Sequence, residues 1–227
     1  MLSILNQRGG NHNSCEDSVF VKETDTVIYG GVFDGCSSGE NSHWASQTFA
    51  YVFKKYMEDF FGDLDYSVML PAAKKLSTIA AMLNINTDTH LLSTCVLFYY
   101  NKAKKTLDVR CFGDGVFYVN DVEFIIDQGN IPDYLGYALK NATVENLLQY
   151  FDKYPILPFT DVDRFIICSD GIQAIHENQY EPASVKWEEL LLAPPASENY
   201  LKRMWNILKN KKFTLSDDLT IVSYATT

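Results

Sequence analysis

The chain has 227 residues, 47% of them hydrophobic, so residues 1–227 can bury a substantial core as a single domain. Its 19 basic and 29 acidic residues leave a formal net charge of −10, which argues against nucleic-acid binding. Five cysteines without paired spacing favour a reducing compartment, and no run approaches the roughly twenty apolar residues of a membrane span. We therefore expect a monomeric cytoplasmic protein that does not associate with membranes.

The first part of the chain is predicted to form a β-hairpin followed by two helices. Residues 19–21 and 26–33 are rich in β-branched and aromatic residues and flank a short polar stretch, a pattern typical of a hairpin. Ser42 could cap a helix with an aromatic-rich apolar face, and a second helix is predicted over residues 72–83. As an antiparallel pair, these helices would form one outer layer.

The rest of the chain is predicted to hold most of the strands and two further helices. Apolar runs predict strands at residues 93–100, 106–112, 116–119, 122–126, 164–168 and 219–224. Helices over residues 144–151 and 198–208 would supply the opposite outer layer. The stretch 127–140 would be a reduced flap, in which Tyr134 or Tyr137 packs.

Acidic clusters stand at the ends of the predicted strands. In an antiparallel hairpin the start of one strand lies beside the end of the other, so Asp17 and Asp34 should be neighbours. Pairing residues 164–168 with 219–224 would likewise bring Asp170 beside Asp217. Each Asp-Gly pair alone could be an ordinary turn. Together, the clusters would place several carboxylates on one rim of the molecule.

A rim of carboxylates has a specific chemical consequence. Like charges a few ångströms apart cannot all ionise without a strong cation or retained protons. Oxygen ligands without a matching Cys/His array select Mg²⁺ or Mn²⁺ over zinc. Two such ions sharing a carboxylate could hold a hydroxide suited to in-line attack at phosphorus. The clusters therefore predict a metal site with hydrolytic chemistry.

Five stretches, taken in chain order, resemble the successive motifs of the type-2C metal-dependent protein phosphatases. They are Cys15-Glu16-Asp17-Ser18, Gly31-Val32-Phe33-Asp34-Gly35, Phe112-Gly113-Asp114-Gly115, Ile167-Cys168-Ser169-Asp170-Gly171-Ile172 and Ser216-Asp217-Asp218-Leu219-Thr220-Ile221. The resemblance spans nearly the whole chain. It implies an α+β fold, a four-layer α-β-β-α sandwich of two antiparallel sheets flanked by helices. It also implies hydrolysis of phosphoserine and phosphothreonine in a phosphorylated protein, the product of a Ser/Thr kinase.

The resemblance assigns the main metal ligands to the strand ends. Asp34 would bridge two Mn²⁺ or Mg²⁺ ions, and the Gly35 carbonyl would bind one of them. Asp170 and Asp217 would bind the other ion. Asp218 fills a place where the family often has asparagine, so we expect Asp217 to be the ligand of that pair.

The remaining acidic motif residues have supporting roles by the same resemblance. Glu16 and Asp17 would bind or orient metal waters. Asp114 matches an aspartate that helps to hold a third, weaker ion in many bacterial members.

Several positions depart from the family pattern. His12 stands where an arginine usually grips the substrate phosphate, and it could contact phosphate or be a surface loop residue. Arg8 is near enough in sequence to be a substitute. Cys36 could be a redox-sensitive thiol or a small residue tolerated in a loop. The segment between Asp114 and Asp170, which usually carries a flap beside the active site, is shorter than in most members.

Two functions remain open from the sequence. The first is a protein serine/threonine phosphatase that uses the acidic rim. The second is a phosphatase-like module that has lost catalysis and binds a signalling partner. The missing arginine favours the second function, whereas the retained set of carboxylates favours the first.

Overall fold

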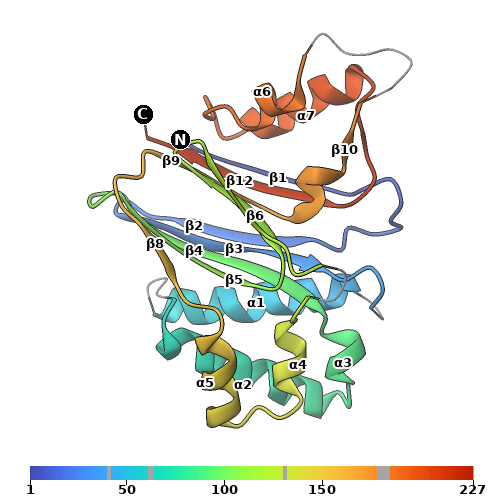
Figure 1. The fold of residues 1–227 in the computed structure, drawn as a ribbon, viewed down its shortest axis with the longest axis vertical. Coiled ribbons are helices and arrows are strands. Elements are labelled where there is room, and N and C mark those ends of the chain that lie inside the picture. The colour runs from blue at the N-terminus through green and yellow to red at the C-terminus, as the bar shows by residue number, and fades with distance from the viewer. Residues whose placement is uncertain (40–41, 61–63, 130–131, 178–184, 227) are drawn as a thin grey trace.

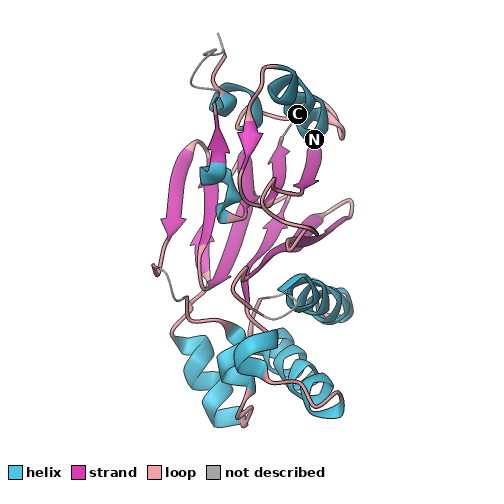
Figure 2. Ribbon diagram, turned by 90° about the vertical axis from the view of Figure 1, so that its right-hand side faces the viewer, coloured by secondary structure: helices cyan, strands magenta, loops and turns pink. Residues whose placement is uncertain are grey.

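The computed structural model describes residues 1–39, 42–60, 64–129, 132–177 and 185–226. Within these residues the chain forms an α+β sandwich of two five-stranded antiparallel sheets with helices on both outer faces (Figure 1). Figure 2 shows the same arrangement from the side, with the strands between two groups of helices. The fold class expected from the resemblance is confirmed.

The two sheets are built from strands of both halves of the chain. One sheet has the order β1-β12-β9-β6-β7 and the other has the order β2-β3-β4-β5-β8. The strands of the first are β1 (Leu2–Gln7), β12 (Leu219–Ala225), β9 (Arg164–Cys168), β6 (Gly115–Val119) and β7 (Val122–Ile126). Those of the second are β2 (Ser18–Glu23), β3 (Val27–Gly35), β4 (Ser93–Asn101), β5 (Thr106–Phe112) and β8 (Leu157–Phe159). A short ribbon pairs β10 (Ile175–His176) with β11 (Thr214–Leu215).

The inward faces of the two sheets share one apolar core. Strand residues alternate between the two faces of a sheet, so every second side chain points at the opposite sheet. Phe98 of β4 packs against Phe165 of β9, with ring centroids 5.4 Å apart. Tyr100 also contacts Phe165, and its hydroxyl donates to the Val162 carbonyl at 2.8 Å. This core holds the two sheets face to face.

Two helical layers cover the outer faces. The layer on the β2–β8 sheet contains α1 (Ser42–Asp59), α2 (Tyr66–Met82), α3 (Thr87–His90), α4 (Leu135–Leu139) and α5 (Val144–Asp152). The other layer contains α6 (Trp187–Leu191) and α7 (Tyr200–Asn210). A 3₁₀ helix, η1 (Asp170–Ala174), follows β9 directly. Within the described residues, none of the helices combines the length and the apolar character that crossing a bilayer requires.

Two helix predictions need correction. The helix over residues 144–151 was expected opposite α1 and α2, which is wrong, because α5 buries Leu147 and Phe151 in the same core as those two helices. The chain then enters β8, which pairs with β5 in that same sheet, so the helix must stay on its side. The second helix begins earlier than predicted, because Asp65 caps it by accepting from the Ser67 amide. The predicted capping side chain of Ser42 lies outside what the structure describes.

A buried arginine connects this helical layer to the sheet. The side chain of Arg110 on β5 donates to the Leu64 carbonyl at 2.8 Å and to the Phe151 carbonyl at 2.7 Å. Its guanidinium also lies over the rings of Tyr66, Phe112 and Phe151. Because the residue is only 3% exposed, these contacts replace its water and link the ends of α2 and α5.

Candidate active site

The hairpin register places the first two acidic motifs together. Ser18 of β2 faces Phe33 of β3, so Asp17 and Asp34 lie next to one another at the end of the sheet. The charge of Asp17 acts directly on Asp34, as the sequence predicted. The Gly35 amide donates to the Glu16 carbonyl, which continues the pairing beyond β2.

Two further acidic motifs, at the ends of β9 and β12, meet in the β1-β12-β9-β6-β7 sheet. Cys168 of β9 pairs with Ile221 of β12, which confirms the predicted antiparallel pairing. The two strands are joined beyond that pair, where the Thr220 amide donates to Ser169 Oγ at 3.0 Å. The Ser169 hydroxyl in turn donates to Asp17 Oδ2 at 2.7 Å. This hydrogen bond links the two sheets at the rim and places the four motifs at one end of the sandwich.

A cleft of about 400 Å³ opens at this end of the sandwich. Asp34, Asp114, Asp170 and Asp217 line it, together with Gly35. The other lining residues are Cys36, Ser37, Ser38, Thr94, Gly129, Pro132 and Tyr134. None of these described lining residues is a lysine or an arginine, so the cleft has four carboxylates and no permanently cationic side chain.

The electrostatics of the cleft disfavour four ionised carboxylates. Burial, followed by the charges of Asp17 and Asp170, raises the pKa of Asp34 well above its ordinary value. Burial also raises the pKa of Asp217, although the Asp218 amide opposes the shift by donating to it. The pKa of Asp114 is raised by burial as well, against the stabilising hydrogen bond from the Gln128 amide. The protein alone therefore leaves this charge uncompensated.

Asp17 neighbours Asp34 but does not line the cleft itself, and it is only 4% exposed. Burial is the main cause that raises its pKa to about 7, and the charge of Asp218 adds to the shift. The hydrogen bond from Ser169 opposes the shift. Asp17 Oδ1 has no hydrogen-bond partner among the described residues. A buried carboxylate oxygen without a donor is most easily explained as a group that faces a cation or its water.

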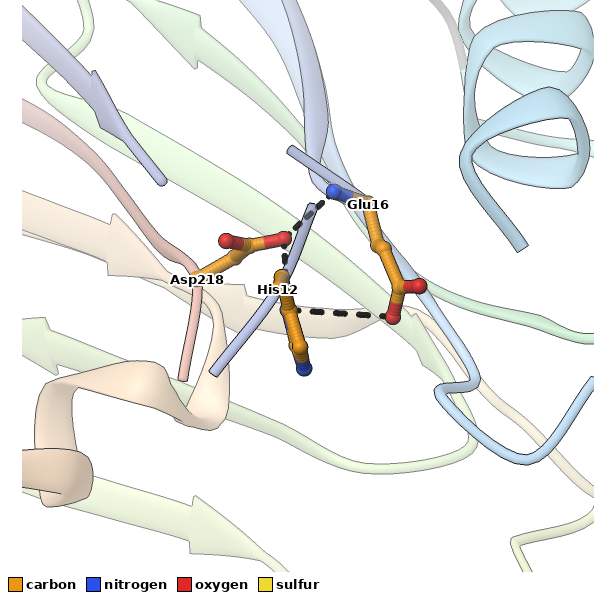
Figure 3. Close-up of side chains that lie close together, drawn as sticks. All are labelled: His12, Glu16 and Asp218. Carbon is orange, nitrogen blue, oxygen red and sulfur yellow. Dashed lines mark hydrogen bonds and ion pairs between the residues drawn. The ribbon is translucent and has the colours of Figure 1, made fainter. Parts of the chain in front are cut away.

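His12, Glu16 and Asp218 form a second group beside the cleft (Figure 3). His12 Nδ1 lies 3.0 Å from Asp218 Oδ2 and 3.8 Å from Glu16 Oε2. Within the described chain, each of the three offers one potential ligand atom, and these atoms lie within 4.8 Å of one another. Burial opposes the charged imidazole, but the adjacent Asp218 carboxylate, together with Glu16 and Asp217, raises the pKa of His12. His12 is therefore part of an acidic network and is not an isolated surface residue.

Arg8 and Cys36 occupy different surroundings. The guanidinium of Arg8 donates to the Asn13 carbonyl at 2.9 Å, so this exposed residue is bonded within its own loop. Cys36 lines the cleft, and its sulfur lies 3.1 Å from Ser38 Oγ. The three cysteines expected in the core, Cys95, Cys111 and Cys168, are buried. All five cysteines, each in a described segment, are free.

The sequence interpretation missed several neutral residues of the site. Ser169 was part of an acidic motif, and its place directly before Asp170 was the available signal for its role beside Asp17. Thr94 lies opposite Asp34 in the β3–β4 register, a relation that follows once those strands are paired. Tyr134 reaches the cleft from the segment before α4, which the sequence had placed in a reduced flap without giving this side chain a role in the site.

The residues of the cleft fit hard divalent cations. Their side chains supply carboxylate oxygens, and Gly35, which can offer only backbone atoms, lines the cleft with them. The pKa of Asp34 is raised by burial, and Asp17 Oδ1 is buried without a hydrogen-bond partner among the described residues. Both features are typical of a site in which a bound cation neutralises the carboxylates. Mg²⁺ and Mn²⁺ match this donor set better than zinc or copper.

Comparisons with known proteins agree with this interpretation. A family model described as Protein phosphatase 2C matches residues 8–221. The solved structure of RsbX in complex with magnesium is 18% identical, covers 98% of this chain and 94% of its own, and superposes with a TM-score of 0.57. No curated protein sequence matches the chain.

Two further solved structures show the same likeness. A bacterial serine phosphatase in which one arginine is replaced by glutamate is 12% identical to this chain, with a TM-score of 0.67. The match covers 100% of this chain and 98% of that one. The serine/threonine phosphatase Stp1 from Staphylococcus aureus is 12% identical over 100% of this chain and 94% of its own, with a TM-score of 0.62. At these identities, the likeness establishes the shared fold.

Proposed function

Since this chain belongs to the protein phosphatase 2C family, we propose that it is a metal-dependent phosphatase that hydrolyses phosphoserine and phosphothreonine in proteins. The observation that carries the proposal is the cleft, in which Asp34, Asp114, Asp170 and Asp217 come together without a lysine or arginine among the described lining residues. A phosphate dianion would be repelled by such a surface unless cations lay between them.

The proposed metal ligands follow from the placement of these groups. Asp34 and the Gly35 carbonyl would hold the ions at the end of β3, while Asp170 and Asp217 would hold them from the opposite sheet. Asp114 would contribute to a weaker third site. When bound, Mn²⁺ or Mg²⁺ would act as a Lewis acid and supply a water-derived nucleophile for attack at phosphorus.

The protein itself would position the reactants around these ions. Ser169 orients the Asp17 carboxylate by donating a hydrogen bond to Oδ2. Oδ1, which has no partner among the described residues, would then be available to a metal ion or its water. Ser37, Ser38 and Thr94 line the cleft, and their hydroxyl groups would donate hydrogen bonds to a phosphate or its waters. His12 stands at the rim, within 3.4 Å of Ser37 Oγ, and is our candidate phosphate contact in place of the family arginine.

A second function is favoured by one specific observation. Arg8 is hydrogen-bonded to Asn13, and the described cleft residues include no arginine that could bind a phosphate. A phosphatase-like module that binds a phosphorylated signalling partner without turnover would tolerate this loss. The carboxylate set favours the enzyme, because each buried carboxylate destabilises a protein that has no use for it.

Hydrolysis assays separate the two functions. A phosphothreonine peptide and p-nitrophenyl phosphate would be incubated with Mn²⁺, with EDTA, and with the Asp34→Asn variant. Asp163→Asn is the matched control, because it changes an exposed carboxylate at the opposite end of β9 that pairs with Lys105. Metal-dependent turnover lost in Asp34→Asn and retained in Asp163→Asn would support the phosphatase. Mn²⁺ binding without turnover would favour the binding module.

A further inference from the structure

Two of the residues that line the cleft differ in chemistry from the rest. Pro132 and Tyr134 each bring a large apolar side chain, whereas the other described lining residues bring carboxylates, hydroxyl groups, one thiol or only backbone. A phosphorylated residue is an ester, so it has an organic group as well as a phosphate. Cations and hydroxyl groups suit the phosphate, whereas apolar contact stabilises the organic group. Pro132 and Tyr134 are therefore the described part of the cleft that suits the organic group.

Asp133, which stands between these two residues in the chain, is hydrogen-bonded through three different groups. Its amide donates to Gln128 Oε1 at 2.7 Å, and its carbonyl accepts from the Tyr150 hydroxyl at 2.7 Å. Its carboxylate accepts from the Tyr154 hydroxyl at 2.8 Å, through Oδ2. Lys153 Nζ lies 3.5 Å from the same oxygen, but its side chain is exposed and such pairs contribute little. Both the backbone and the side chain of Asp133 are therefore held in place.

The two tyrosines that bind Asp133 are packed in the core beside the cleft. Tyr150 lies in α5 and is buried, and Tyr154 follows that helix by two residues. Both rings pack against Phe112, the last residue of β5, with ring centroids 5.8 and 5.6 Å away. Phe112 is itself buried, and the chain continues from it to Asp114, which lines the cleft. Asp133 is therefore anchored to the same buried cluster that supports this acidic motif.

The chain on either side of Asp133 is closely packed as well. α4 follows Tyr134 directly, and a Cβ at Gly136 would lie 2.0 Å from the Leu91 carbonyl oxygen, so the helix backbone rests on the chain before β4. A Cβ at Gly113 would lie 3.4 Å from Pro132 Cβ, so the proline lies against the turn after β5. Tyr134 is only 7% exposed, so its ring is packed on most sides. Both apolar residues of the cleft thus have a defined position.

We propose that Pro132 and Tyr134 form an apolar wall that contacts the organic group of the phosphate ester, and that Asp133 is a positioning residue that holds this wall to Tyr150 and Tyr154. The inference rests on the proposed phosphatase function, because it assigns one wall of the cleft to part of that substrate. Inorganic phosphate has no organic group, so the wall adds nothing to its affinity. The wall would therefore favour the ester over the phosphate that hydrolysis releases.

Two ligands separate the wall from the rest of the cleft without an assay of turnover. Titration calorimetry with saturating Mg²⁺ would give the Kd of inorganic phosphate and of a phosphonate analogue of a phosphothreonine peptide, whose C–P bond replaces the ester bond. We expect Tyr134→Ala to raise the Kd of the peptide by about threefold, as the loss of roughly 25 Å² of apolar contact predicts. The Kd of inorganic phosphate should stay unchanged. An equal loss for both ligands would mean that the whole cleft is disturbed, and would overturn the proposal.

Substitutions at the anchor test the positioning role of Asp133. Asp133→Ala removes the acceptor and Tyr154→Phe the donor of one hydrogen bond, so each should weaken peptide binding by about twofold, and the double variant should not exceed the larger single effect. Asp133→Asn keeps an oxygen for Tyr154 and should bind the peptide as wild type does. The matched control is Tyr66→Phe, which removes a hydroxyl that donates to Asp152 and does not line the cleft. It should leave both Kd values unchanged.

Failure of this inference differs from failure of the proposed function. If the wild type hydrolyses phosphopeptides but binds the phosphonate peptide no more tightly than inorganic phosphate, the wall is excluded and the phosphatase stands. The same conclusion follows if Tyr134→Ala and Asp133→Ala bind the peptide as wild type does. If these variants weaken peptide binding alone and no metal supports turnover, the phosphatase fails and the wall remains part of a binding site. A wild type that binds neither ligand would overturn both.

Discussion

Asp17→Asn should make the metal-free protein more stable and less responsive to metal. Asp17 is buried at the rim, with its pKa raised to about 7 from a reference value of 3.8, and burial is the largest cause. A carboxylate whose pKa is raised on folding is destabilising wherever it is ionised. The ionised Asp17 therefore lowers the free energy of unfolding of the metal-free protein, and bound cations would offset this loss.

The size of the effect follows from the shift. A rise from 3.8 to about 7 is about three pKa units, which corresponds to about 4 kcal/mol of lost stability once the group is ionised in both states. The loss is absent below the unfolded pKa, grows as the pH rises towards 7, and is complete above it. Asparagine removes the charge and keeps an oxygen for Ser169. If half of the cost is recovered, about 2 kcal/mol would raise the melting temperature by about 4–8 °C.

Thermal melts in EDTA at pH 8 and pH 5 measure this effect. Asp17→Asn should melt higher than wild type at pH 8, and the difference should shrink at pH 5. Asp163→Asn, which removes an exposed carboxylate paired with Lys105, should change stability by less than about 0.5 kcal/mol. Added Mn²⁺ should raise the melting temperature of wild type more than that of Asp17→Asn. A lower melting temperature for Asp17→Asn at pH 8, or an equal gain at both pH values, would refute the reasoning.

Three further substitutions test the rim. Asp34→Asn should abolish tight Mn²⁺ binding and turnover together, because it removes the charge of a carboxylate that lines the cleft. If the heat of a Mn²⁺ titration is unchanged in this variant, Asp34 is not a metal ligand. His12→Arg should lower KM for a phosphopeptide if position 12 faces phosphate, since arginine adds a permanent charge; steady-state kinetics showing the same KM would place the residue away from the substrate. Gly171→Ala should reduce metal affinity by at least about tenfold, because a Cβ there would lie 1.7 Å from the Asp218 carbonyl oxygen and would displace both acidic motifs. A Mn²⁺ titration that gives the wild-type affinity would contradict the steric argument.

The sequence alone predicted the acidic rim and most strands of the two sheets, whereas β1 and β8 were not predicted. β-Rich runs of the right length and the symmetry of a hairpin were enough to predict that Asp17 lies beside Asp34, because antiparallel pairing is a local rule. The pairing of β9 with β12 followed from the same rule applied to two distant runs. Both strand pairings follow from backbone geometry. The residue types along each run are enough to show that it is a strand and where it ends.

Only the tertiary structure decided which side chains meet across the two sheets. The link from Ser169 to Asp17 joins the two sheets through residues 152 positions apart. Within one sheet, the hydrogen bond from the Gly9 amide to Asp218 spans 209 positions. The side of the sandwich that α5 covers depended on the sheet that β8 joins, a choice that the helix pattern does not contain. Such contacts depend on the path of loops and on the direction of each side chain, and periodicity along the chain carries neither. The physical reason is that a hydrophobic pattern specifies which face is buried, whereas the partner buried against it is selected by the packing of the whole molecule.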